Sequence, residues 1–85
     1  MGSDPGYRPG RREAGDEHLQ EFCDRNGISK RESEVLRLVL QGKSNQEVAD
    51  ELFLALGTVK THVHNLLVKC DKKKRDDLIL YFWQS

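Results

Sequence analysis

Apolar residues recur at spacings of three and four along several stretches of the chain, which is the period of an amphipathic helix. The clearest stretch opens with Ser29 and Glu32, which fit a capping box in which each side chain satisfies a free backbone N–H group. Gly42 supplies a stop at its far end. Between them lies an apolar stripe at helical spacing, formed by Val35, Leu36, Val39 and Leu40. The pattern therefore predicts a helix that begins at Ser29 and ends just before Gly42.

Two more helices are expected directly after it. Ser44 and Glu47 form a second capping box, which opens a short helix over residues 44–52 with an apolar side of Val48, Ala49 and Leu52. The segment 53–57 is too irregular to continue that face and is interpreted as a turn. The next helix runs from about Gly57 or Thr58 to Cys70, with an apolar side formed by Val59, Val63, Leu66, Leu67 and Cys70. Its opposite side carries Lys60, Thr61, His64, Asn65 and Val68.

Weaker patterns flank this central part. Leu19, Phe22 and Cys23 predict a short helix from Asp16 to Asn26, and Asp76 and Asp77 suit the positive end of a last helix from about Arg75 to Trp83. Residues 1–15 contain both prolines and no apolar periodicity, so a disordered lead-in or linker is expected there. The domain is then expected over residues 16–85, with its core in residues 28–80.

These elements predict an all-α fold, a small four-helix domain with an extra short N-terminal helix. The helices 44–52 and 58–70, joined by a tight turn, have the features of a helix-turn-helix. That motif needs a small residue in its first helix, supplied here by Ala49, and polar groups on the outer face of its second helix, which reads base edges in the major groove.

The charge distribution agrees with a nucleic-acid partner. The net charge is zero, with 14 basic and 14 acidic residues, but residues 58–75 carry six bases and one acid. A local basic surface attracts phosphates whatever the total charge is, although a lysine run alone is more often a solvated face. No apolar run approaches the roughly 18 to 20 residues of a membrane span, so no membrane contact is expected.

Little in the sequence points to catalysis or to a cofactor. Cys23 and Cys70 lie far apart and form no metal-ligand pattern, so both are interpreted as reduced thiols in small apolar niches, with a disulfide the less favoured alternative. Glu32 and Glu47 already have capping roles, and no activated nucleophile stands at a plausible spacing. We therefore expect no enzyme, no cofactor and no metal.

A resemblance makes the prediction specific. Residues 28–80 resemble the LuxR-type (GerE-like, NarL/FixJ-like) DNA-binding domain of bacterial transcription regulators. The matching segments are Ser29 to Leu36, Gly42 to Ala49, Leu52-Phe53 and Gly57 to Val63, and Asn65, Lys69 and Arg75 also fall at family positions.

The resemblance implies sequence-specific binding of double-stranded DNA in the bacterial cytoplasm. At matching positions, Lys60, Thr61 and His64 would read bases. Residues near backbone phosphates would be Ser44, Asn45, Thr58, Asn65 and Lys69. The resemblance also implies that the last helix forms a dimer contact, for which the candidates are Leu78, Tyr81, Phe82 and Trp83. A homodimer, RNA polymerase and an upstream sensor or receiver domain are the further partners expected.

Four positions depart from the family pattern. Ala55 stands where a capping serine is usual, Cys70 replaces a leucine, Asp71 replaces a glycine in a left-handed position, and Lys72 replaces a core residue. We expect these changes to loosen the junction between the last two helices. Two alternatives remain open, namely a promoter-reading domain of a sigma factor and a degenerate helix-turn-helix that binds only protein.

Overall fold

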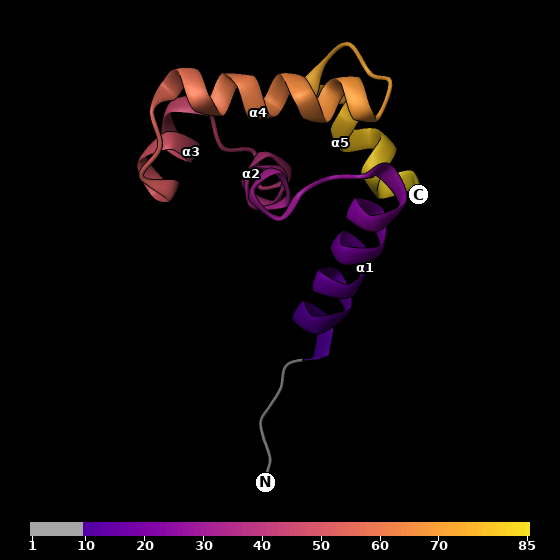
Figure 1. Ribbon diagram of the computed structural model, residues 1–85. Helices are drawn as coiled ribbons and strands as arrows, with labels where there is room; N and C mark the ends of the chain where they lie inside the picture. The colour runs from indigo at the N-terminus through magenta and orange to yellow at the C-terminus, as the bar shows by residue number, and fades with distance from the viewer. Residues whose placement is uncertain (1–9) are drawn as a thin grey trace, which may run out of the picture.

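The computed structural model describes the backbone of residues 10–85 and the side chains of residues 17–85. Within that range every regular element is a helix, which confirms the all-α prediction. The helices are α1 (Gly10–Asn26), α2 (Lys30–Leu40), α3 (Asn45–Leu52), α4 (Leu56–Lys69) and α5 (Arg75–Gln84). Figure 1 shows α4 lying across α2, with α3 under one end of α4 and α5 and α1 toward the other.

Both predicted capping boxes are present. The Glu32 N–H group donates to Ser29 Oγ at 3.3 Å, and the Ser29 N–H group donates back to Glu32 Oε1 at 3.0 Å. Ser44 and Glu47 form the same pair at the start of α3, at 3.2 and 2.8 Å. Since these bonds satisfy amides that would otherwise lack a partner, each helix starts at a defined residue.

The turn between α3 and α4 is three residues long. Phe53 ends α3 in the left-handed region with φ 56°, and the Leu54 N–H group donates to the Ala49 carbonyl at 2.9 Å. Ala55 is the N-cap of α4 and makes no side-chain capping bond, as its departure from the family pattern predicts. Helix α4 therefore begins at Leu56, slightly before the predicted start.

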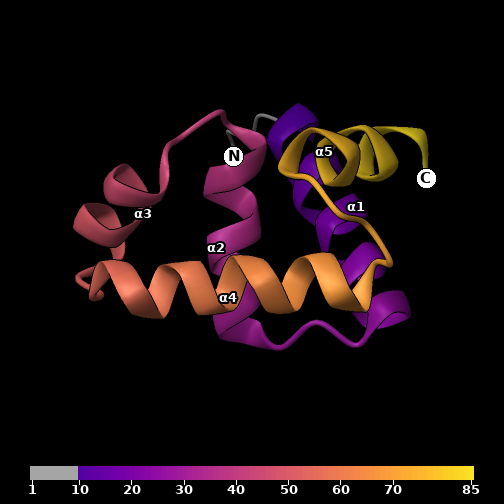
Figure 2. The same cartoon turned by 90° about the horizontal axis from the view of Figure 1, so that it is seen from above.

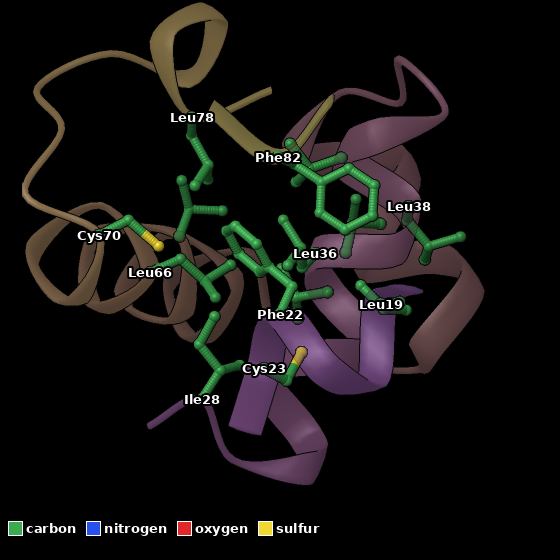
Figure 3. Close-up of a cluster of buried hydrophobic side chains, with 14 of the residues drawn as sticks. Leu19, Phe22, Cys23, Ile28, Leu36, Leu38, Leu66, Cys70, Leu78 and Phe82 are labelled. Atoms are coloured by element: carbon green, nitrogen blue, oxygen red, sulfur yellow. The ribbon is translucent and has the colours of Figure 1, made fainter. Parts of the chain in front are cut away.

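All five helices contribute to one buried core, and Figure 3 shows the part of it where α1, α2, α4 and α5 converge. Helix α1 contributes Leu19, Phe22 and Cys23 to this core, and Phe22 is completely buried. Its ring packs edge-to-face on Phe82 of α5, with centroids 5.0 Å apart, and on Tyr81 at 5.3 Å. The predicted N-terminal helix is thus an integral part of the fold.

Helix α1 is longer than the sequence pattern predicts. It begins at Gly10 instead of Asp16, so the expectation of a disordered lead-in is wrong for residues 10–15. The Arg-Arg-Glu-Ala run at residues 11–14 has high helix propensity, which explains how the helix extends past the last apolar residue. Residues 1–9, the rest of the expected lead-in, lie outside the described residues.

The α4–α5 junction accommodates its unusual residues. Asp71 has φ 57°, the left-handed conformation expected at this position, and the Lys72 N–H group closes the helix end on the Leu67 carbonyl at 2.8 Å. Cys70 is buried, and the Lys72 ammonium lies 4.8 Å from the centre of the Tyr81 ring. At the position where the family pattern has a core residue, half-buried Lys72 thus makes a cation–π contact with Tyr81.

Candidate nucleic-acid interface

Helix α4 has one buried side and one exposed side. Val59, Val63 and Leu66 are buried against the rest of the chain. The side chains predicted to read bases, Lys60, Thr61 and His64, are all exposed. Figure 2 looks down on α4 and shows it uncovered along its length. The buried apolar side thus fixes α4 against the rest of the chain, while its polar side chains face solvent.

The hydrogen bonding of Thr61 limits what it can offer. Its hydroxyl donates to the Gly57 carbonyl at 3.1 Å, one turn earlier in α4. A threonine that bonds back in this way has no hydroxyl proton left for a base, so its methyl group and an oxygen lone pair are what remain.

The N-terminal end of α3 is fixed by a residue of α5. Arg75 donates from Nη1 to Asn45 Oδ1 and from Nη2 to the Lys43 carbonyl, the second bond at 2.6 Å. Ser44 Oγ accepts from the Glu47 amide, and Ser44 itself is exposed. Two of the predicted phosphate-contacting residues therefore lie together at this helix end.

The other predicted phosphate-contacting residues lie on α4. Thr58 is exposed near its start, and Asn65 is half-buried in its middle. The side chain of Lys69, at the end of the helix, is 34% exposed, and its ammonium pairs with Glu32 at 2.5 Å. The structure thus gives Lys69 an intramolecular partner that the sequence pattern did not predict.

Glu32 is the one buried charged residue among those whose side chains are described, with 6% of its surface exposed. Burial raises the pKa of its carboxyl group, but hydrogen bonds from Lys69 and from the Ser29 amide, together with the Lys69 charge, outweigh that effect. The net result is a pKa below the ordinary 4.5. Glu32 is therefore ionised at neutral pH in the folded protein.

The predicted dimer residues do not lie on one face. Leu78 and Phe82 are buried in the chain's own core, so their assignment to a dimer contact is wrong. Tyr81 is half-buried, and its hydroxyl donates to Asn26 Oδ1 at 3.3 Å. Trp83, in contrast, is 65% exposed. Because a helix completes a turn every 3.6 residues, the apolar run of α5 places some side chains in the core and others in solvent.

The sequence patterns did not predict the surroundings of three further residues, two in α5 and one in α1. Leu80, one turn before Trp83, is 55% exposed. Arg75 was noted only as a family position, without a partner. No sequence pattern indicates a role for His18, yet its ring packs edge-to-face on Phe82 at 4.6 Å, and Nε2 lies 3.1 Å from the Phe82 carbonyl. No signal in the sequence pairs residues 64 positions apart, whereas the helical period alone places Leu80 beside Trp83.

The two cysteines are buried thiols, as interpreted from the sequence. Burial, followed by the negative charge of Asp24, raises the pKa of the Cys23 thiol to about 11. Burial also raises the pKa of Cys70. Both groups are therefore protonated and weak as nucleophiles or metal ligands. Among the described residues no three His, Cys, Asp or Glu side chains gather as a metal site.

In the described part of the chain, no helix combines the length and the apolar character needed to cross a bilayer.

Comparison with known proteins agrees with this geometry. The chain is 44% identical over 54 residues to the transcriptional regulatory protein LiaR of Bacillus subtilis, a match that covers 64% of this chain and 26% of LiaR. It is 40% identical over 57 residues to the response regulator protein VraR of Staphylococcus aureus, covering 67% of this chain and 27% of VraR. The chain thus spans about a quarter of the length of these relatives.

The family match covers most of the folded region. Residues 26–82, which run from the end of α1 into α5, match the family described as bacterial regulatory proteins, luxR family. Helix α1 lies almost wholly outside this match, although it packs on α5. Because the match extends over more than half of its residues, the chain belongs to the luxR family of bacterial regulatory proteins.

Proposed function

We propose that this chain binds double-stranded DNA through α4 in the major groove and acts in the regulation of transcription. The observation that carries the proposal is the exposure of Lys60, Thr61 and His64 on the outer side of a helix whose inner side is core. Base edges are read by such polar groups on a rigid recognition helix. Family membership supports a regulatory role and no enzymatic one.

Each base-reading residue has a distinct contact in this proposal. The Lys60 ammonium donates to O6 or N7 of guanine, and the His64 ring donates from whichever nitrogen carries the proton. Thr61, with its hydroxyl proton engaged by Gly57, contacts the methyl group of thymine. A good base contact discriminates by about 1–3 kcal/mol against the wrong base.

The phosphate contacts give affinity without sequence preference. Thr58 and Asn65 along α4, and Ser44 and Asn45 at the start of α3, are the proposed contacts. Lys69 contributes its charge at the edge of this surface while it pairs with Glu32. The exposed Lys73 and Lys74 of the α4–α5 loop extend the positive surface.

A homodimer through α5 is the proposed assembly, in which the exposed Leu80 and Trp83 form the apolar contact. Two copies would read two half-sites separated by about one helical turn of DNA. Relatives several times longer than the match support the proposal that a sensor or receiver domain acts on this domain in the whole protein. RNA polymerase is the further partner proposed, and the bacterial cytoplasm the compartment.

Two alternative functions would use the same fold differently. A domain that binds only protein would leave α4 unused, and a sigma-factor domain would read promoters without an operator of its own. The match to the luxR family and to regulators named as such favours the operator-reading function over the sigma-factor one.

Fluorescence anisotropy with a labelled random-sequence duplex tests the proposal. We expect binding at about 50 mM salt that weakens steeply by about 200 mM, because bound counterions are released from the duplex. The control is Lys30→Ala, which removes an exposed charge from α2, outside the proposed interface. Absence of binding at the lower salt concentration would refute the proposal and favour the protein-only function. A pool of random duplexes then yields the operator.

A further inference from the structure

Arg75 joins two parts of the chain that are distant in sequence. It is the first residue of α5, and its side chain reaches Lys43 and Asn45 at the end of the α2–α3 loop. Figure 2 shows the start of α5 beside that loop. One guanidinium nitrogen donates to Asn45 Oδ1, and the other donates to the Lys43 carbonyl at 2.6 Å. Both terminal nitrogens of the guanidinium group thus donate hydrogen bonds at the start of α3, and Arg75 is half-buried.

This contact determines how Asn45 is oriented. A guanidinium group carries only donors, so the atom that faces it must be the carbonyl oxygen of the asparagine and not its nitrogen. The Asn45 amide nitrogen then points away from Arg75, and it has no hydrogen-bond partner among the side chains and backbone described for this chain.

The surroundings of that nitrogen are suited to an anion. Asn45 is the first residue of α3, where the N–H groups of Asn45 and Gln46 have no carbonyl one turn earlier in the helix. The capping box already engages the amides of Ser44 and Glu47. The donors that remain at this helix end are therefore adjacent, and one of them is a side chain held by Arg75.

We propose that Arg75 is a positioning residue for DNA binding, which holds the Asn45 oxygen so that the Asn45 amide nitrogen donates to a backbone phosphate. The inference rests on the proposed function and assigns to α5 a part in forming the DNA surface on α3. Direct pairing of Arg75 with a phosphate is the alternative, and it requires Arg75 to leave Asn45.

The first test replaces Asn45 and keeps Arg75 in place. Asn45→Asp retains two acceptor oxygens for the guanidinium but has no donor and adds a negative charge. We expect a free energy of unfolding in urea at least as high as that of the wild type, because a carboxylate suits the positive helix end beside Arg75. The affinity for random duplex should fall by roughly tenfold or more, as for loss of a hydrogen bond to a charged group. An affinity equal to that of the wild type would overturn the inference.

The second test is a double-mutant cycle with the same duplex. Arg75→Met lowers affinity in the wild-type background and has no further effect on Asn45→Ala, because Arg75 acts through Asn45. The slope of log affinity against log salt stays the same, whereas a lost ion pair with phosphate would reduce it by about 0.9. Additive losses, or a reduced slope, would each refute the positioning role.

Arg75→Lys separates charge from geometry. Lysine keeps the positive charge but cannot hold Asn45 and Lys43 at once as the planar guanidinium does. We expect its affinity to stay low, and full rescue would overturn the inference even if Arg75→Met fails to fold. A wild-type protein that binds no duplex refutes the proposed function itself, whereas wild-type binding with additive losses refutes only the role of Arg75.

Discussion

Lys69 Nζ lies 2.5 Å from Glu32 Oε1, and this ion pair joins the last turn of α4 to the first turn of α2. The same carboxylate oxygen accepts from the Ser29 amide at 3.0 Å. One buried side chain therefore caps α2 and fixes the end of the proposed recognition helix. Since Lys69 has its partner within the chain, we expect replacement of Lys69 to affect the position of α4.

This pair predicts how stability depends on pH. The pKa of Glu32 is lower in the folded protein than its ordinary 4.5, so its contribution is present above that value and is lost as the pH falls through the folded pKa. The free energy of unfolding, measured in urea from neutral pH into acid, should therefore fall less steeply for Glu32→Gln than for the wild type, and the two curves should converge in acid.

Glutamine is the appropriate replacement because it preserves the capping box. Glu34→Gln is the control, since it removes a carboxylate from the same helix whose ion pair with Arg31, at 2.9 Å, is exposed and therefore contributes little to stability. A Glu32→Gln curve that stays parallel to the wild type would show that the Lys69 pair contributes nothing to the pH dependence.

The missing cap of α4 predicts a stabilising substitution. Ala55 has the extended backbone of an N-cap, with φ −68° and ψ 147°, but no side-chain oxygen. Ala55→Ser should raise the free energy of unfolding by about 1 kcal/mol, because its hydroxyl accepts from a free amide in the first turn. Ser44→Ala, which removes an existing cap from α3, should lower it by a similar amount. Equal stability of Ala55→Ser and the wild type would mean that water already satisfies these amides.

The position of α1 predicts that the domain depends on a helix outside its family match. Phe22 is fully buried and packs on Phe82, so Phe22→Ala should lower the free energy of unfolding by about 3–5 kcal/mol. Phe53→Ala is the matched control, because Phe53 is 94% exposed and its replacement should change stability by less than about 0.5 kcal/mol. Similar unfolding midpoints for Phe22→Ala and Phe53→Ala would show that α1 does not stabilise the rest of the domain.

Local signals allowed most of the helices to be predicted. Contacts between residues far apart in the sequence could not be predicted in the same way. The capping boxes at Ser29 and Ser44 lie within four residues, so the sequence contains all that determines them. The α5 prediction was only partly right, because an apolar run shows no period and therefore cannot distinguish buried Phe82 from exposed Trp83. The bond from Arg75 to Asn45 spans 30 residues and depends on the packing of α5 against the α2–α3 loop.

The exposed position of Lys60 on α4 predicts that its replacement lowers the sequence specificity of DNA binding. Lys60→Ala should lower affinity for the cognate site by about 1–3 kcal/mol and affinity for random duplex much less, since a base contact discriminates and a phosphate contact does not. Titrations of both duplexes at one salt concentration measure the difference. Equal losses on the two duplexes would reassign Lys60 to the phosphate backbone.

The exposed apolar pair on α5 predicts self-association through Trp83. Trp83 is 65% exposed, and its ring packs edge-to-face on buried Phe82 at 4.9 Å, so the ring is supported from within while most of the residue remains in water. Trp83→Ala should weaken the dimer by about 2 kcal/mol, as for a central aromatic contact, and leave unfolding of the monomer nearly unchanged. Gln84→Ala, at the exposed neighbouring position, is the control and should retain the wild-type dimerisation constant. Sedimentation equilibrium measures all three proteins. If the wild type is a monomer at every concentration, α5 does not mediate dimerisation in this domain, and any pairing on DNA must then arise from the half-sites or from another part of the whole protein.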